Sequence, residues 1–194
     1  MQADSAKLED LRKLASTLSQ QQVKIDALFV NAGIAPPNAF ESTTADAFDT
    51  VFDTNVKGVF FTVQTLLPLV KDGAAIVLTG SIVGNKGLPN LSLYNASKAA
   101  VRSLARSLAS DLSPRRIRVN CLSPGLTETP IFKTGLKMDD AQIEQLKLSA
   151  RSTVPLGHVA QPGQIATAAL FLGSSAASYV NGVELSVDGG MAQV

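Results

Sequence analysis

Several residue types are scarce in this chain, and the scarcity of cysteine and histidine argues against particular kinds of site. Of 194 residues, 17% are charged, 5% are aromatic and none is tryptophan, and there is one cysteine and one histidine. A single cysteine, Cys121, excludes an internal disulfide. We interpret Cys121 as a buried residue that packs in the core. A catalytic thiol would need His158, which we interpret as a structural or interface residue. The sequence contains no cluster of histidine, cysteine and carboxylate residues that would predict a metal site.

The charge balance and the apolar runs also narrow the range of partners. The formal net charge is +1, which argues against a nucleic-acid partner. The longest apolar stretch, residues 56–70, is interrupted by Lys57, Gln64 and Pro68 and is too short to cross a membrane. The polar N-terminus, MQADSAKLED, is not typical of a signal peptide. We therefore expect a cytoplasmic protein without a membrane partner.

Hydrophobic residues are abundant, at 45% of the chain, which is enough for one domain with a sizeable core over residues 1–194. Continuous apolar runs predict buried strands at residues 26–33, 74–81, 117–125 and 183–190. Helical spacing predicts helices at residues 5–20, 44–70, 93–112, 139–150 and 162–173. This alternation indicates an α/β fold, a parallel sheet with helices on both faces.

Polar and turn-forming residues follow the predicted strands. Each alone is typical of a strand end, a cap or a turn. Together they should meet at one edge of the sheet, where such folds bind ligands. They are Asn31, Ala32 and Gly33 after the first strand, Ser81 after the second, and Pro124, Gly125, Thr127 and Thr129 after the third.

The stretch SLYNASKAAV places Tyr94 and Lys98 four residues apart at the start of a predicted helix. Residues at this spacing share one helix face, so the two side chains should lie close together. A lysine ammonium beside a phenol would lower the pKa of the tyrosine and make it a proton donor and acceptor near neutral pH. An amphipathic helix with one aromatic and one solvated lysine is the alternative that this pair alone leaves open.

Taken together, these motifs resemble the short-chain dehydrogenase/reductase family along the whole chain. The resemblance rests on NAG at residues 31–33, TNVKG around Asn55, Ser81, YNASK at residues 94–98, PG at residues 124–125 and VDGG near the end. YxxxK alone is a weak signal. YxASK after a strand-end serine, followed by NxxxPG, is a specific one.

The resemblance implies a catalytic role for four residues. Tyr94 would be the general acid/base, and Lys98 would lower its pKa and bind the nicotinamide ribose. Ser81 would orient and polarise the substrate carbonyl or hydroxyl. Asn55 would hold a water that links Lys98 to solvent. Hydride transfer leaves negative charge on the substrate oxygen, which a serine hydroxyl and a tyrosine proton would stabilise.

The resemblance also implies an NAD or NADP cofactor and a small-molecule alcohol or ketone substrate. Asp4 resembles the aspartate that meets the adenine in this family. The remaining cofactor-contacting positions would be Asn31, Ala32, Gly33, Tyr94, Lys98, Pro124, Gly125, Thr127 and Thr129. The segment 126–150, with Ile131, Phe132, Leu136 and Met138, corresponds to the region where the family sets its substrate. It would form a partly apolar pocket wall, and packing of a surface lid explains these residues equally well.

The family begins with a strand and a glycine-rich TGxxxGxG turn for the cofactor phosphates, and this sequence contains no such turn. The resemblance thus implies a Rossmann-like doubly wound sheet whose N-terminal strands are missing, with residues 26–33 at its edge. We consider an incomplete fragment, a chain that has lost catalysis, and an edge covered by another chain. The NAD or NADP preference is not readable, and weak cofactor binding is expected.

Three functions therefore compete at this stage. The first is an oxidoreductase that uses Asn55, Ser81, Tyr94 and Lys98. The second is a catalytically inactive assembly partner that keeps the family interface. The third is an acyl-transfer enzyme built on Ser81, which lacks the GxSxG elbow typical of that chemistry. The apolar edge predicts that another chain covers it. The resemblance implies that the long helices at residues 44–70 and 93–112 pair across the subunits of a homo-oligomer, a dimer or tetramer.

Overall fold

A computed structural model describes residues 1–194, and its strands form one parallel sheet in the order β1-β2-β3-β4. The apolar runs predicted as strands all become strands, and the two central runs carry the side chains that two helical layers bury. Neighbouring strands pair in parallel throughout. This confirms the predicted α/β fold. The strands are β1 (Ile25–Val30), β2 (Val70–Thr79), β3 (Arg118–Pro124) and β4 (Glu184–Val187).

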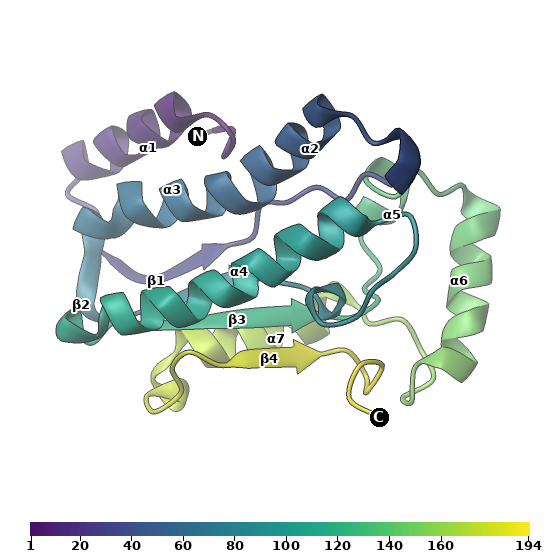
Figure 1. The fold of residues 1–194 in the computed structure, drawn as a ribbon. Helices are drawn as coiled ribbons and strands as arrows, with labels where there is room; N and C mark the ends of the chain where they lie inside the picture. The colour runs from purple at the N-terminus through teal and green to yellow at the C-terminus, as the bar shows by residue number, and fades with distance from the viewer.

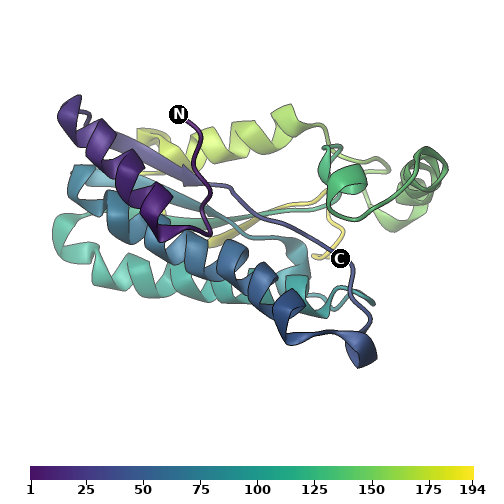
Figure 2. The same ribbon diagram turned by 90° about the horizontal axis from the view of Figure 1, so that it is seen from above.

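Helices cover both faces of this sheet (Figure 2). The layer on one face holds α1, α2, α3 and α4, and α7 lies against the other face. No helix has both the length and the apolar character needed to cross a membrane. The helices are α1 (Leu8–Gln20), α2 (Ala45–Phe52), α3 (Gly58–Leu66), α4 (Ser92–Asp111), α5 (Ile131–Thr134), α6 (Asp140–Thr153) and α7 (Pro162–Gly173).

Two apolar cores hold the helices to the sheet, and a third lies beside it. The largest joins α3 and α4 to one sheet face and includes Ile76, Leu78, Val101 and Val119, all fully buried. A smaller core joins the other face to α7 through Leu172. The third connects α5 and α6 at the carboxyl ends of the strands, which are on the right in Figure 1.

The long helix predicted for residues 44–70 is interrupted in the structure. Residues Asp53–Lys57 form a π-helical turn between α2 and α3, and Leu67–Leu69 form a 3₁₀ turn that contains Pro68. Val70 then opens β2, four residues before the predicted start of that strand, because it pairs with Ile25 of β1. Helical periodicity does not reveal a π turn, since one extra residue shifts the register only locally.

Two strands also differ from the prediction. The β1 strand lies at the sheet edge, as predicted. Its apolar run predicted burial on both faces, but most of the strand is half-buried or exposed, with Phe29 47% exposed. The predicted strand at residues 183–190 ends at Val187. Gly189 and Gly190 adopt φ values of +64° and +90°, which are left-handed conformations that turn the chain away from the sheet.

Candidate active site

The carboxyl ends of the strands open onto one cavity of about 690 Å³. Parallel strands end at the same sheet edge, so the polar residues that follow them meet there, as predicted. Asp4, Ala32 and Asn55 are the predicted site residues that do not line this cavity. The predicted residues that do line it are Asn31, Gly33, Ser81, Tyr94, Lys98, Pro124, Gly125, Thr127 and Thr129.

Tyr94 and Lys98 lie one turn apart on α4 and face the cavity together. The Lys98 Nζ atom is 5.7 Å from the centroid of the Tyr94 ring. Lys98 is only 4% exposed, and its ammonium donates a hydrogen bond of 2.8 Å to the Thr79 carbonyl at the end of β2. A solvated surface lysine, the alternative left open by the sequence, is therefore excluded.

Burial shifts the pKa values of both side chains. Desolvation lowers the pKa of Lys98 to about 8, because the protein interior disfavours its charged form. Burial also raises the pKa of Tyr94 above its ordinary value, and interaction with the Ser81 hydroxyl opposes that rise. The Lys98 ammonium, 5.7 Å from the centroid of the Tyr94 ring, donates its hydrogen bond to the Thr79 carbonyl. The predicted effect of Lys98 on Tyr94 stays a prediction.

The buried ammonium makes folding stability depend on pH. Between about pH 8 and pH 10.4 the folded chain has released the Lys98 proton while the unfolded chain still holds it, so this residue makes stability rise with pH. We expect the difference in unfolding free energy between wild type and Lys98→Met to change by about 3 kcal/mol at most across that window. Urea unfolding of both proteins at pH 7 and pH 10 measures it. A difference that is independent of pH would contradict a desolvated lysine.

Asn55 lies on the π turn and is fully buried behind the cavity. Its Oδ1 atom accepts a hydrogen bond of 2.8 Å from the Ile34 amide, and its Nδ2 atom donates to the Ile34 carbonyl at 2.9 Å and to Ser97 Oγ at 3.0 Å. The extra residue of the π turn aims this side chain at the loop after β1, and π turns are frequent at functional sites. The structure thus gives Asn55 three protein partners, and its predicted role in holding a water stays a prediction.

Gly33 separates Asn55 from Lys98 and leaves room beside both. A Cβ atom at this position would lie 3.3 Å from Lys98 Nζ and 3.4 Å from Asn55 Oδ1. Asn31, two residues earlier, accepts a hydrogen bond of 3.0 Å from the Thr79 hydroxyl. A side chain at position 33 would therefore crowd the Lys98 ammonium at the cavity wall, and glycine keeps this position clear.

Ser81 follows β2 and opens a 3₁₀ turn at Ile82–Gly84, with its hydroxyl accepting a hydrogen bond of 3.4 Å from the Val83 amide. Gly80 before it still donates to the Leu122 carbonyl of β3 at 2.8 Å, so the sheet holds the backbone up to the serine. Asp4 lies apart from the cavity. Its carboxylate accepts from the Ala6 amide and is 3.5 Å from the Lys7 ammonium.

Asn38 is a positioning residue that the sequence analysis missed. Its Oδ1 atom accepts a hydrogen bond of 3.3 Å from the Leu93 amide, and its Nδ2 atom donates to Ser92 Oγ and Thr43 Oγ1, both at 2.9 Å. These bonds tie the loop after β1 to the first turn of α4, one residue before Tyr94. The capping partner lies more than 50 residues away along the chain, so no local sequence signal identifies it.

A buried polar network behind the site was also missed. The Glu184 carboxylate of β4 accepts hydrogen bonds of 2.8 Å from Ser123 and from Asn85, and Arg102 of α4 lies 3.5 Å away. The network joins two strands, α4 and the end of the turn that follows Ser81. A glutamate inside an apolar strand segment was the signal, because a buried carboxylate requires partners.

The VDGG motif has a structural role at the C-terminus. The Asp188 carboxylate accepts hydrogen bonds from the Gly190 amide at 3.0 Å and from the Ala192 amide at 2.8 Å. A Cβ atom at Gly125 would lie 2.7 Å from Asp188, so only glycine allows the chain after β3 to pass this turn. The motif thus supports the cavity wall at residues 124–125.

Comparison with known proteins agrees with this geometry. The sequence profile of a family described as Enoyl-(Acyl carrier protein) reductase matches residues 1–192. Oxidoreductase asL5 of Sarocladium schorii is 39% identical, and the alignment covers 100% of this chain and 76% of that protein. The NADP-dependent (R)-specific alcohol dehydrogenase of Lentilactobacillus kefiri is 33% identical, with 98% and 75% covered.

A solved structure extends the similarity to three dimensions. It is the crystal structure of 3-ketoacyl-(acyl-carrier-protein) reductase from Brucella melitensis complexed with NADH. The two chains are 35% identical and superpose with a TM-score of 0.84, covering 98% of this chain and 76% of the other. The four-stranded sheet and its flanking helices therefore match those of proteins that carry a nicotinamide cofactor.

Proposed function

The chain belongs to the short-chain dehydrogenase/reductase family, and from this premise we propose that it transfers a hydride between NAD or NADP and a small-molecule alcohol or ketone. The observation that carries the proposal is the shared cavity of Ser81, Tyr94 and Lys98, in which a buried lysine lies beside a half-buried tyrosine. Membership of the family makes the chain an oxidoreductase by type. The chemistry of its site residues is the part that we propose.

The proposed mechanism assigns one proton path and one oxyanion site. When bound, a nicotinamide cofactor would supply the hydride to the carbonyl carbon or, in the reverse direction, accept it. The Ser81 hydroxyl donates a hydrogen bond to the carbonyl oxygen and stabilises its developing charge. The Tyr94 phenol gives its proton to that oxygen during reduction and takes it back during oxidation. The Lys98 ammonium favours the tyrosinate that remains after proton transfer.

Four further residues would shape the cofactor side of the site. Asn31 and Gly33 line the cavity at the end of β1, and Thr127 and Thr129 line it after β3. The Thr127 hydroxyl donates to the Gly125 carbonyl at 3.1 Å, which orders the loop at this point. We propose these residues, with Lys98, as the contacts for the nicotinamide half of the cofactor. Asp4 as an adenine contact and a cytoplasmic location stay predictions from the sequence.

A titration with NADH and with NADPH tests the proposal most directly. The sequence contains no TGxxxGxG turn, so we expect residues 1–194 to bind both cofactors more weakly than the relatives do. Lys98→Ala should weaken binding by about tenfold or more, because a charged hydrogen bond contributes about 1.5–3 kcal/mol. Calorimetry measures both effects.

The matched control is Lys71→Ala, whose ammonium pairs with Asp26 in β1 at the far end of the sheet. This variant should bind like wild type. Equal binding by Lys98→Ala would contradict the proposed cofactor site. No binding to either cofactor would favour the alternative, a catalytically inactive assembly partner.

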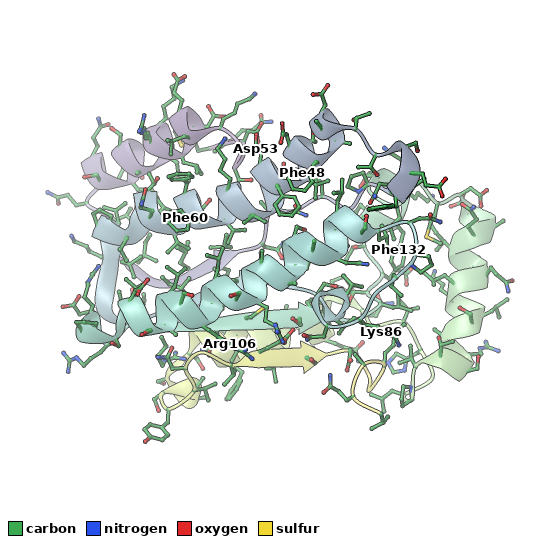
Figure 3. The ribbon with its side chains drawn as sticks, viewed as in Figure 1. Phe48, Asp53, Phe60, Lys86, Arg106 and Phe132 are labelled. Carbon is green, nitrogen blue, oxygen red and sulfur yellow. The ribbon has the colours of Figure 1, made fainter.

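We also propose that the chain forms a homo-oligomer, a dimer or tetramer. Two phenylalanines lie exposed on the layer of α2, α3 and α4, Phe48 at 44% and Phe60 at 38%. Figure 3 labels them on the side of the molecule that also carries Arg106. Apolar rings of this kind stabilise an interface when a partner covers them. Light scattering at micromolar concentration should give at least twice the mass of 20.3 kDa, and a monomer would contradict the proposal.

A further inference from the structure

The cavity that holds Ser81 and Tyr94 contains one charged side chain. Lys98 is the only acidic or basic residue among the 30 that line it, and 17 of them are hydrophobic. Its ammonium is almost fully buried, donates to the Thr79 carbonyl and is the group that we propose for the cofactor, so a substrate meets little of its charge. A carboxylate that entered this cavity would lose its hydration without gaining an ionic partner.

Most hydroxyl groups of the lining threonines are also engaged within the protein. Thr127 donates to the Gly125 carbonyl, Thr134 donates to the Pro130 carbonyl at 2.9 Å, and Thr79 donates to Asn31. A substrate with several hydroxyl groups needs several free partners, because each buried polar group left unpaired is costly. Few such partners are available around Ser81 and Tyr94.

Apolar side chains from two parts of the chain line the cavity instead. Leu88 and Leu91 come from the segment between Ser81 and Tyr94, and Ile131 and Leu136 come from α5 and the residues after it. The second pair packs against the apolar cluster that includes Phe132, which Figure 3 labels. That cluster anchors the wall from behind. The segment around α5 therefore both packs as a lid and lines the pocket, which joins the two alternatives left open by the sequence.

We infer that the substrate is an uncharged ketone with apolar substituents, or the corresponding secondary alcohol, and that carboxylates and polyols are excluded. The inference rests on the proposed function, since it assigns a substrate class to the same site. Leu88, Leu91, Ile131 and Leu136 are its specificity-determining residues, because burial of apolar substituents against them is favourable.

Two cyclic ketones that differ in one substituent test the inference. One is a cyclohexanone with a methyl group opposite the carbonyl, and the other carries a carboxylate at that carbon. Binding is measured by calorimetry with and without NADPH or NADH, and turnover by the loss of reduced cofactor. We expect the methyl-substituted cyclohexanone to bind at least about 10²-fold more tightly than the carboxylate-substituted one, the range by which unpaired polar groups set specificity.

Two variants should then weaken the preference. Leu136→Lys places an ammonium in the wall and should raise the affinity for the carboxylate about tenfold. Leu88→Lys does the same from the other part of the chain, in case the first variant does not fold. The control is Leu148→Lys on α6, where the side chain is 53% exposed and does not line the cavity. This variant should keep the wild-type preference.

Each outcome separates the substrate class from the proposed function. Equal or tighter binding of the carboxylate by wild type overturns the inference, and so does binding of neither ketone. Preferential binding of the methyl-substituted cyclohexanone without turnover of either compound supports the inference and counts against the proposed function. Unchanged preference in both lysine variants would show that these leucines do not determine specificity and would overturn that assignment.

Discussion

Replacing Tyr94 with phenylalanine is expected to lower kcat for ketone reduction by about 10²- to 10⁴-fold, the range for loss of a general acid. The ring would keep its packing beside Lys98 and Ser81, because the two side chains differ only in the hydroxyl. The substrate oxygen would lose its proton source while the Ser81 hydroxyl remained. Steady-state rates with the methyl-substituted cyclohexanone and saturating NADPH or NADH measure the effect.

The chain provides its own control for this experiment. Its only other tyrosine, Tyr179, is fully exposed, and Tyr179→Phe should leave kcat unchanged. Cofactor affinity of Tyr94→Phe should stay within a few-fold of wild type. A kcat for Tyr94→Phe within threefold of wild type would refute the role of Tyr94 as the proton donor.

Replacing Asn55 with leucine is expected to lower the free energy of unfolding by about 3–5 kcal/mol, since each buried polar group left unpaired costs about 1–3 kcal/mol. The substitution removes three hydrogen bonds, to the amide and carbonyl of Ile34 and to Ser97. Asn55 is 0% exposed, so water does not replace them. Urea unfolding measures the loss, provided that the dependence of the unfolding free energy on urea concentration (the m-value) equals that of wild type.

Lys57→Leu is the matched control for this loss. Lys57 lies on the same π turn and is exposed, with its ammonium 3.1 Å from the Asp53 carboxylate. Such surface pairs contribute about 0–1 kcal/mol, so this variant should be nearly as stable as wild type. A loss below about 1 kcal/mol for Asn55→Leu would mean that the Ile34 loop finds other partners.

Local patterns predicted most of the secondary structure and the central pair of the site. Residues 162–173 were predicted as a helix and form α7 with the same bounds, because proline at the first helical position and the apolar spacing both act locally. The four-residue spacing predicted that Tyr94 and Lys98 would lie on one helix face, which the structure confirms. The parallel order of the strands followed from alternating helices and strands.

Long-range contacts determined what those patterns did not reveal. The π turn that carries Asn55, the cap that Asn38 provides to α4, and the Glu184 network all join residues far apart in the sequence. The direction of the Tyr94 pKa shift also depends on how distant segments pack. Burial raises the pKa of Tyr94, which the spacing does not reveal, and the lowering expected from Lys98 stays a prediction.

Sequence periodicity specified which residues are apolar and which of them share a face, because these properties depend on a few neighbouring positions. That was sufficient for the fold class and the strand-end residues, whereas the catalytic candidates followed from the resemblance to a known family. Burial, hydrogen-bond partners and the absence of free charge in the cavity depend on how distant segments pack. Those features separate a general α/β sheet from a site that we propose for apolar ketones, and they exist only in the folded chain.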